Sequence, residues 1–267
     1  MDRRNFLKTG GIALLGSLAT GSAMALTTPG ALGGEGADKK AAVALAMNHF
    51  GVSEADLKKV LAAALEKGGD YADLFFEHTI SNSIRLMDGA VNNSYSNIDY
   101  GVGVRVLTGD QSGYAYVENI TVEDMLKAAR TAARIASANK GNKPLNLTEK
   151  ELKKNYYTVA SPWEEVSLKD KMPYLQKLND RIFALDKRVH KVQASQSDTT
   201  SHIFFCNSEG VMFYDYRPMV TLGAVCIMEE DGKTENGYAA RAYRRGFDFL
   251  SDEVVDVIAR EAVDQTS

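Results

Sequence analysis

Hydrophobic positions at helical spacing predict two helices early in the chain. The first is expected over about residues 37–49. Ser53 is placed to cap a second helix, whose first turn is acidic and therefore suits the positive end of the helix dipole. The apolar positions of this second helix recur three or four residues apart: Leu57, Val60, Leu61 and Leu65. Gly68-Gly69 is expected to end it.

From Asp70 onward the pattern changes from helical to strand-like. Four short runs rich in β-branched and aromatic residues follow, at 74–76, 83–86, 102–106 and 114–117. Turn sequences such as Asp88-Gly89 separate them. The order predicts an antiparallel meander, and Gly101 and Gly103 predict places where neighbouring strands approach closely.

A third helix is predicted from Thr121 to about residue 138, because Thr121-Val122-Glu123-Asp124 resembles a capping box. Its inward positions are mostly small and predict close packing against a sheet: Met125, Ala128, Ala129, Ala132, Ala133 and Ile135. Residues 37–138 are therefore expected to form one α+β module.

The polar, lysine-rich segment 139–160 is predicted to link this module to a second one over residues 161–267. A helix is expected from Ser167, with Met172, Leu175, Leu178 and Ile182 on one face. Strands are expected at about 190–197, 202–207, 211–216 and 219–229, with turns at 208–210 and 217–218, and a last helix after Ser251. The layout predicts an α+β fold of antiparallel sheets with packed helices in two consecutive modules.

Overall charge argues against one class of partner. The 267 residues carry a net charge of −4, so no basic field is available to attract nucleic acid, and no nucleic-acid partner is predicted. Cys206 and Cys226 are too few for a disulfide framework. We interpret them as two buried thiols, because a free cysteine usually packs as a small hydrophobic residue. A disulfide between them in an oxidising compartment is the alternative.

The N-terminus has the features of an export signal. Arg3 and Arg4, followed by Asn5-Phe6-Leu7-Lys8, resemble a twin-arginine motif. An apolar run over 10–18 comes next, too short for a permanent membrane span. Small residues predict cleavage after Ala25, so 1–25 is interpreted as a signal peptide and 26–36 as a flexible linker. The protein is expected to be exported to the periplasm by the twin-arginine pathway; a basic N-terminal helix without a targeting role is the alternative.

The histidines do not have the spacing of a metal site. A catalytic zinc needs three protein ligands and a water. The chain has four histidines, His49, His78, His190 and His202, and no two are three to five residues apart. Glu77 and His78 are neighbours on a predicted strand, where adjacent side chains face opposite ways. No metal ligand and no catalytic residue is therefore assigned in this chain.

One basic segment is a candidate for substrate binding. Arg241, Arg244 and Arg245 lie beside Tyr238 and Tyr243. Guanidinium groups bind carboxylates through paired hydrogen bonds, so these arginines are predicted to contact a carboxylate or a peptide backbone. A solvated loop of mixed charge is the alternative.

The order of several short runs resembles the PmbA/TldD family of zinc metallopeptidases, also called modulators of DNA gyrase. In the first half the runs are Asp70-Tyr71-Ala72-Asp73-Leu74-Phe75-Phe76-Glu77, Leu86-Met87-Asp88-Gly89, Asp99-Tyr100-Gly101-Val102-Gly103-Val104-Arg105-Val106 and Gly113-Tyr114-Ala115-Tyr116. In the second half they are Arg217-Pro218-Met219-Val220, Glu229-Glu230-Asp231-Gly232-Lys233, Gly246-Phe247-Asp248-Phe249 and Glu261-Ala262-Val263. The resemblance covers residues 50–267 and looks closer to the TldD than to the PmbA type. It departs at 238–245, where relatives often carry a glycine-rich run.

The resemblance implies a function that this chain would serve only in part. It implies a zinc held by a His-Glu-x-x-x-His segment, cleavage of unfolded peptides in a closed cavity, and a homodimer or a TldD–TldE-like heterodimer. Because no such segment occurs in these 267 residues, the chain is expected to be the N-terminal portion of an exported zinc metallopeptidase, shaping cavity walls and subunit contacts, and inactive alone. A non-catalytic PmbA/TldE-like binding subunit and a truncated inactive gene product are the alternatives.

Overall fold

A computed structural model describes residues 39–136, 148–149 and 159–266. The predicted signal peptide with Arg3, Arg4 and Ala25, the linker 26–36 and most of the linker 139–160 lie outside the described residues. The helices are α2 (Lys39–Phe50), α3 (Glu54–Ala64), α4 (Val122–Ile135), α5 (Leu168–Leu185) and α6 (Asp252–Asp264), with short 3-10 turns η2 (Trp163–Glu165) and η3 (Phe247–Phe249). The strands are β1 (Tyr71–Met87), β2 (Ala90–Thr108), β3 (Gln111–Val117), β4 (Thr148–Glu149), β5 (Val189–Asn207), β6 (Val211–Glu230) and β7 (Lys233–Tyr243).

The helices begin at the capping residues from which their starts were predicted. The Ser53 hydroxyl accepts the amide hydrogen of Asp56, whose carboxylate accepts in return from the Ser53 backbone. The Thr121 and Ser251 hydroxyls cap α4 and α6 by accepting the amide hydrogens of Asp124 and Val254. Ile135 departs from its prediction, because it lies at the last turn of α4 and is 57% exposed instead of packed on the sheet.

All the strands join one sheet in the order β3-β2-β1-β5-β6-β4, with β7 paired to β6. The pairings are antiparallel except for the short β4, which runs parallel to β6. The first and second predicted modules meet at the centre, where β1 pairs with β5 from Asp73↔Asn207 to Met87↔Gln193. The α+β, antiparallel prediction is thus confirmed, with both modules contributing to one shared sheet.

The strands are longer than their hydrophobic pattern indicated. The predicted strands 74–76 and 83–86 are parts of the single strand β1, and 190–197 and 202–207 are parts of β5. The predicted turn at Arg217-Pro218 is wrong, because both residues continue β6 and pair with Ser201 and Thr200. A proline is tolerated there because β7 pairs with β6 only from Val220 onward, which leaves the second edge of β6 unpaired at Pro218.

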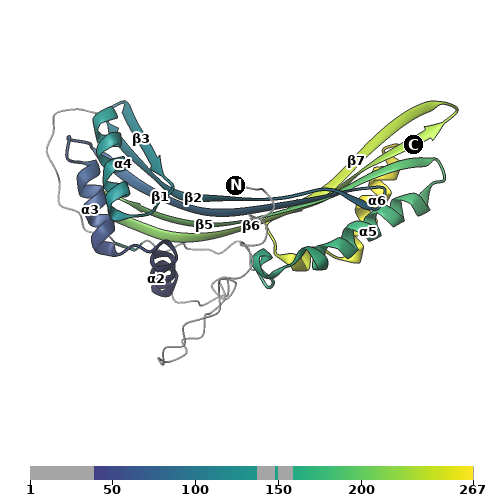
Figure 1. The fold of residues 1–267 in the computed structure, drawn as a ribbon, viewed down its shortest axis with the longest axis horizontal. Helices are drawn as coiled ribbons and strands as arrows, with labels where there is room; N and C mark the ends of the chain where they lie inside the picture. Colours follow the sequence, from purple (N-terminus) through teal and green to yellow (C-terminus); the bar gives the residue numbers. More distant parts are fainter. Residues whose placement is uncertain (1–38, 137–147, 150–158, 267) are drawn as a thin grey trace, which may run out of the picture.

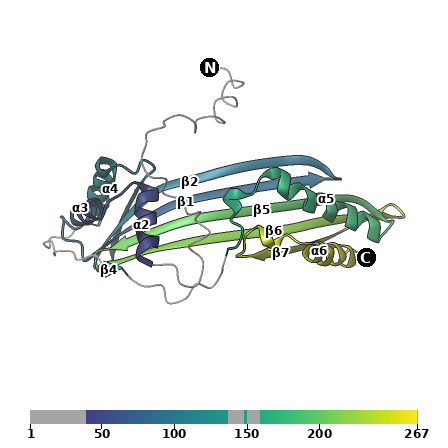
Figure 2. The ribbon, with the colours of Figure 1, turned by 90° about the horizontal axis from the view of Figure 1, so that it is seen from below.

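The helices cover one face of the sheet, and the other face carries none of them (Figure 1). The sheet is curved, and the helices lie on its convex side. Figure 2 shows α2 crossing β1, β5 and β6 near one end, and α5 lying across β5 nearer the other. Exposure along β5 follows this arrangement: from Val192 to His202 buried residues on the helix side alternate with half-exposed ones on the open side.

Two separate hydrophobic cores lie on the helix-covered face. The first packs α2, α3 and α4 on residues such as Phe76, Val104 and Phe204. The second packs α5 and α6 on residues such as Leu86 and Leu222. Each core takes strands from both halves of the sequence. Cys206 belongs to the first core and Cys226 to the second, and both are buried free thiols.

The two glycines of the Gly-x-Gly sequence in β2 lie where neighbouring chain approaches closely, as predicted. A Cβ on Gly101 would lie 2.5 Å from the carbonyl oxygen of Val117, and one on Gly103 would lie 2.4 Å from the hydroxyl of Tyr114. A side chain at Gly101 would therefore require the backbone of β3 to shift, whereas one at Gly103 would require the exposed Tyr114 ring to move.

Candidate functional site

The open face of the sheet carries paired rows of hydroxyl groups at its centre. Thr79, Ser81 and Ser83 of β1 stand opposite Ser201, Thr199 and Ser197 of β5. The Thr79 hydroxyl donates to the Glu77 carboxylate at 2.6 Å and can accept from Ser201 Oγ at 2.8 Å, and the Ser81 and Thr199 hydroxyls lie 3.3 Å apart. Each hydroxyl can both donate and accept. The centre of the open face therefore carries rows of hydroxyl groups, with the Glu77 carboxylate beside Thr79.

The helix-covered face carries a polar belt between its two cores. On β5 the buried residues change from apolar to polar at Gln196, Asp198, Thr200 and His202, which are all at most 5% exposed. Asp198 accepts hydrogen bonds from Lys171 Nζ at 2.5 Å, Asn82 Nδ2 at 2.9 Å and Gln196 Nε2 at 3.0 Å. A buried carboxylate is stable only when it is paired and hydrogen-bonded in this way.

Three histidines come together at one end of this belt. His78 and His202 are register partners of β1 and β5, so their side chains point to the same face. His49 of α2 lies against both, with ring centroids 5.0 Å from His78 and 4.7 Å from His202 and interplanar angles of 28° and 26°. His49 Nε2 and His78 Nδ1 are 2.8 Å apart. We call His49, His78 and His202 the histidine stack.

Hydrogen bonds hold His202 on both sides. Its Nδ1 lies 2.7 Å from the Tyr214 hydroxyl, and its Nε2 lies 3.0 Å from Glu164 Oε1. The Tyr216 hydroxyl donates to the other Glu164 oxygen at 2.9 Å. Glu164 therefore neutralises any charge on His202, and both nitrogens of that ring are engaged.

The surroundings of the stack shift its titrations. Partial burial against the sheet, together with the neighbouring imidazoles, lowers the pKa of His49, which keeps an exposed edge, to about 4 and also lowers the pKa of His78, although Glu164 opposes both shifts. Burial acts to raise the pKa of Glu164, but the hydrogen bonds from His202, its own backbone and Tyr216 outweigh burial and lower it. Burial and the Glu164 charge raise the pKa values of Tyr214 and Tyr216, so both phenols stay neutral donors.

The histidine stack does not fit a zinc ion. Zinc requires lone pairs that converge on one point, whereas these rings are stacked nearly parallel and His202 has no free nitrogen. Across residues 39–136, 148–149 and 159–266 no group of three or more His, Cys, Asp or Glu side chains is placed to hold a metal. The sequence did not indicate that three of its histidines would meet, because their contact depends on strand register and on the placement of α2.

The arginines predicted to bind substrate lie in and just after β7. Arg241 forms an ion pair with Glu261 of α6, and Arg245 forms one with Asp248. The Arg245 carbonyl oxygen also accepts from the Trp163 indole at 2.8 Å. Arg241 is therefore held against α6, and Arg245 is held at the turn after β7. A role of Arg241, Arg244 and Arg245 in substrate binding stays a prediction.

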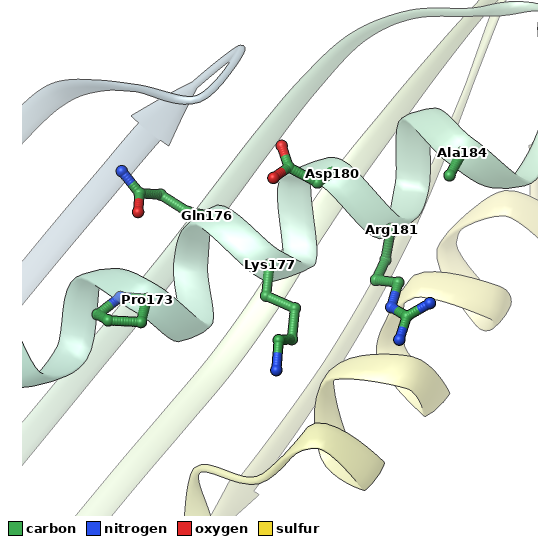
Figure 3. Close-up of a pocket in the computed structure, with 6 residues that line it drawn as sticks. All are labelled: Pro173, Gln176, Lys177, Asp180, Arg181 and Ala184. Atoms are coloured by element: carbon green, nitrogen blue, oxygen red, sulfur yellow. The ribbon is translucent and has the colours of Figure 1, made fainter.

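A shallow charged groove runs along α5, where Lys177 and Arg181 point toward α6 and Gln176 and Asp180 point to the other side (Figure 3). Its lining residues are Pro173, Gln176, Lys177, Asp180, Arg181 and Ala184. Lys177 and Arg181 form ion pairs with Asp252 and Asp256 of α6, so the cations here hold the two helices together. No helix among the described residues is both long and apolar enough to cross a bilayer.

The fold and the sequence together define the class of protein as an α+β metallopeptidase-family chain. The model of the PmbA/TldA metallopeptidase domain 1 matches residues 72–136, and that of the PmbA/TldA metallopeptidase central domain matches residues 161–267. This chain belongs to the PmbA/TldD family.

Named relatives are longer than this chain. It is 32% identical over 206 residues to the metalloprotease TldD homolog of Haemophilus influenzae, covering 73% of this chain and 42% of that protein. It is 26% identical over 207 residues to the TldD homolog of Buchnera aphidicola from Acyrthosiphon pisum, covering 78% of this chain and 43% of that one. The chain thus spans less than half the length of these relatives.

Solved structures share the fold. A putative modulator of DNA gyrase from Thermotoga maritima superposes with a TM-score of 0.62 at 20% identity, over 80% of this chain and 48% of that one. TldE from Thermococcus kodakarensis superposes with a TM-score of 0.56 at 16% identity, over 78% and 46%. At these identities the likeness concerns the fold alone.

Proposed function

We propose that this chain forms a wall and subunit contact of an exported TldD-type zinc metallopeptidase that cleaves unfolded peptides. The open face of the sheet is the observation that carries the proposal. It presents the hydroxyl rows of β1 and β5 on the side that the helices leave uncovered. Hydroxyls can pair with the amide groups of any extended chain, whatever its side chains, which suits an enzyme that accepts varied unfolded sequences.

The catalytic zinc is proposed to be held by residues other than those of this chain. The 267 residues have no two histidines three to five positions apart, and the histidine stack does not fit the ion. The chain therefore contributes binding surface, and the metal and its activated water come from elsewhere in the assembly. The names of the relatives, metalloprotease TldD homologs, support the reaction class.

A second subunit is part of the proposal, either another copy of this chain or a TldE-like partner. The fold shared with TldE supports this kind of pairing. Export through the twin-arginine pathway is proposed from Arg3 and Arg4. Cell fractionation tests that point: the Arg3→Lys, Arg4→Lys double variant should stay in the cytoplasm, whereas periplasmic recovery of the variant would contradict it.

Peptide photocrosslinking tests the wall. An unfolded peptide with a maleimide at one end and a photoreactive group at the other is attached to Thr199→Cys on the open face. The native thiols stay unmodified because Cys206 and Cys226 are buried and burial raises the pKa of each. Crosslinks should map to β1, β5 and β6 around the hydroxyl rows.

A matched attachment at His190→Cys, an exposed position at the start of β5, serves as the control. If crosslinks from Thr199→Cys are no denser on the open face than those from His190→Cys, the peptide does not prefer that surface. The wall proposal would then be wrong.

A non-catalytic binding subunit of the PmbA/TldE type is the second candidate. The sequence without a His-Glu-x-x-x-His segment favours it. The catalytic-subunit and binding-subunit candidates differ in which added protein should restore chelator-sensitive hydrolysis. If the chain is part of the catalytic subunit, only protein that supplies the TldD zinc segment in continuation with it should restore chelator-sensitive hydrolysis. If it is the binding subunit, a separate intact TldD-type subunit should do so.

A further inference from the structure

We propose that the histidine stack is a pH-sensitive latch, which holds helix α2 on the sheet near neutral pH and releases it in mild acid. The stack joins three elements, because His49 belongs to α2, His78 to β1 and His202 to β5. The latch is independent of the peptidase function proposed above.

The contact between His49 and His78 requires a neutral ring. The two nitrogens, Nε2 of His49 and Nδ1 of His78, are 2.8 Å apart, which is a hydrogen-bond distance. One nitrogen must donate a proton and the other must offer a lone pair. When both rings are protonated, both nitrogens carry a hydrogen and the contact becomes a repulsive one between two cations.

The groups around the stack supply one negative charge for three rings. From η2, Glu164 faces the stack, and its carboxylate already binds His202 and Tyr216. From β6 and β2, the neighbours are the phenols of Tyr214, Tyr216 and Tyr100. Glu77 and Asp215 occupy alternate positions on β1 and β6 and so point to the open face.

Glu164 can therefore balance a single proton on His202. Among the described groups facing the stack, a further proton on His49 or His78 has no carboxylate of its own. The lowered pKa values of His49 and His78 agree with this geometry. Because an imidazole in a disordered chain has a pKa near 6.5, acid favours any state in which these two rings are released to water.

Among the α-helices that the structure describes, α2 has the fewest contacts with the rest of the protein. Strands β1 and β5 are fixed by backbone ladders along their whole length. The described buried side chains of α2 are Val43, Ala46 and Phe50, with Phe50 in contact with Phe76 and Phe204. Local opening is cheapest in segments with few buried contacts, so protonation of the stack should free α2 before it disturbs the sheet.

Hydrogen exchange of the full chain, followed by mass spectrometry at pH 7.5 and pH 5, tests the latch. After correction for the intrinsic exchange rate, protection of residues 39–50 should fall at least tenfold at pH 5. Protection of α4, which packs in the same core without a histidine in its sequence, should stay unchanged. Equal protection of α2 at both pH values would overturn the proposal.

Two variants make the test specific. In the variant His49→Gln the glutamine cannot be protonated but can still hydrogen-bond to His78. This variant should therefore lose most of the pH effect on α2. His190→Gln removes the remaining histidine, which lies outside the stack beside Glu229, and should leave the effect intact. If the two variants behave alike, protonation of the stack is not the cause.

A titration that needs no variant gives an independent result. The imidazole resonances of His49 and His78 should titrate below the range of a free imidazole, and the amide shifts of α2 should change with the same midpoints. Titration of both rings as free imidazoles, or α2 shifts without those midpoints, would refute the latch even if His49→Gln failed to fold.

Discussion

Lys171 and Asp198 form an ion pair in the interior of the protein, between α5 and β5. Lys171 Nζ lies 2.5 Å from Asp198 Oδ2, and the two side chains are only 4% and 1% exposed. Asn82 and Gln196 donate to the same carboxylate. The ammonium group also lies 5.3 Å from the centre of the Trp163 ring. This pair fixes the position of α5 over the centre of the sheet.

Removing the lysine should therefore cost much more than removing a surface charge. Lys171→Met leaves the Asp198 carboxylate buried without its cation, which should lower the free energy of unfolding by about 3–5 kcal/mol. Lys177→Met is the matched control on the same helix, because its pair with Asp252 is exposed and should contribute about 0–1 kcal/mol. Urea unfolding of both variants measures the difference.

The double variant Lys171→Met, Asp198→Leu separates the lost attraction from the stranded charge. It should recover part of the loss, since no unpaired ion remains in the interior. Equal unfolding free energies for Lys171→Met and Lys177→Met would show that water reaches the pair and that it is not buried in solution.

The helices could be predicted from the sequence because their signals are local. Ser53 caps α3 as predicted, with Asp56 three residues on completing the capping box, and Leu57 and Leu61 mark the buried face of the same helix. The length of the strands could not be predicted. At the centre of β1 and β5 both faces carry polar side chains, such as Ser197 beside Asp198, so the alternation of apolar and polar residues disappears there.

The candidate site depended on information that the sequence does not display. His78 and His202 are 124 positions apart and meet only because β1 and β5 pair in one particular register. The Lys171–Asp198 pair also crosses from a helix to a strand. By contrast, the family could be recognised from the order of short sequence runs. The turn residues and glycines in these runs are visible in the sequence even where the ends of the strands are not.

Protonation of Glu164 should make the protein less stable in acid. Its pKa is lower in the folded chain than the ordinary value of 4.5, so its contribution is complete above pH 4.5 and is lost as the pH falls through the folded pKa. Glu164→Gln should lower the free energy of unfolding at pH 7 by about 1–3 kcal/mol, since it removes charge-assisted bonds to His202 and Tyr216.

Urea unfolding between pH 3 and pH 7 checks this prediction. The difference between the wild-type protein and Glu164→Gln should shrink below pH 4.5, as the wild-type carboxyl becomes protonated. Tyr216→Phe keeps the carboxylate and removes one donor, so it should cost less at pH 7. A difference that grows in acid would mean that Glu164 is not ionised in the folded protein.

Gly113 of β3 should tolerate no side chain, because α4 passes directly over it. A Cβ at this position would lie 2.0 Å from the carbonyl oxygen of Ala132 and 2.8 Å from the amide nitrogen of Ala136. Both are backbone atoms, so relief requires α4 to move. Gly113→Ala should destabilise the protein by about 1–3 kcal/mol or more.

Gly109 provides the comparison for that variant. It lies in the turn before β3 with a φ of +54°, and a Cβ there would meet nothing within 4 Å. Asparagine adopts this conformation at small cost, so Gly109→Asn should change the thermal midpoint far less than Gly113→Ala. Equal shifts in the two melting curves would contradict the close packing of α4 on β3.

Arg241 allows its structural role to be separated from a role in substrate binding. Its guanidinium group pairs with Glu261 of α6, and both side chains are partly exposed. If the arginine only holds α6, then Arg241→Ala and Glu261→Gln should lower the thermal midpoint equally and leave peptide affinity unchanged. If it also binds a peptide carboxylate, as the sequence predicts, only Arg241→Ala should weaken the binding of a labelled unfolded peptide, measured by fluorescence anisotropy. Arg245 pairs with Asp248, and the same two outcomes apply to it. Arg245→Ala should weaken peptide binding only if Arg245 also contacts the peptide. Unchanged affinity in both arginine variants would remove this segment from the substrate-binding surface, and the hydroxyl rows of the open face would then be the candidate surface left to explain peptide binding.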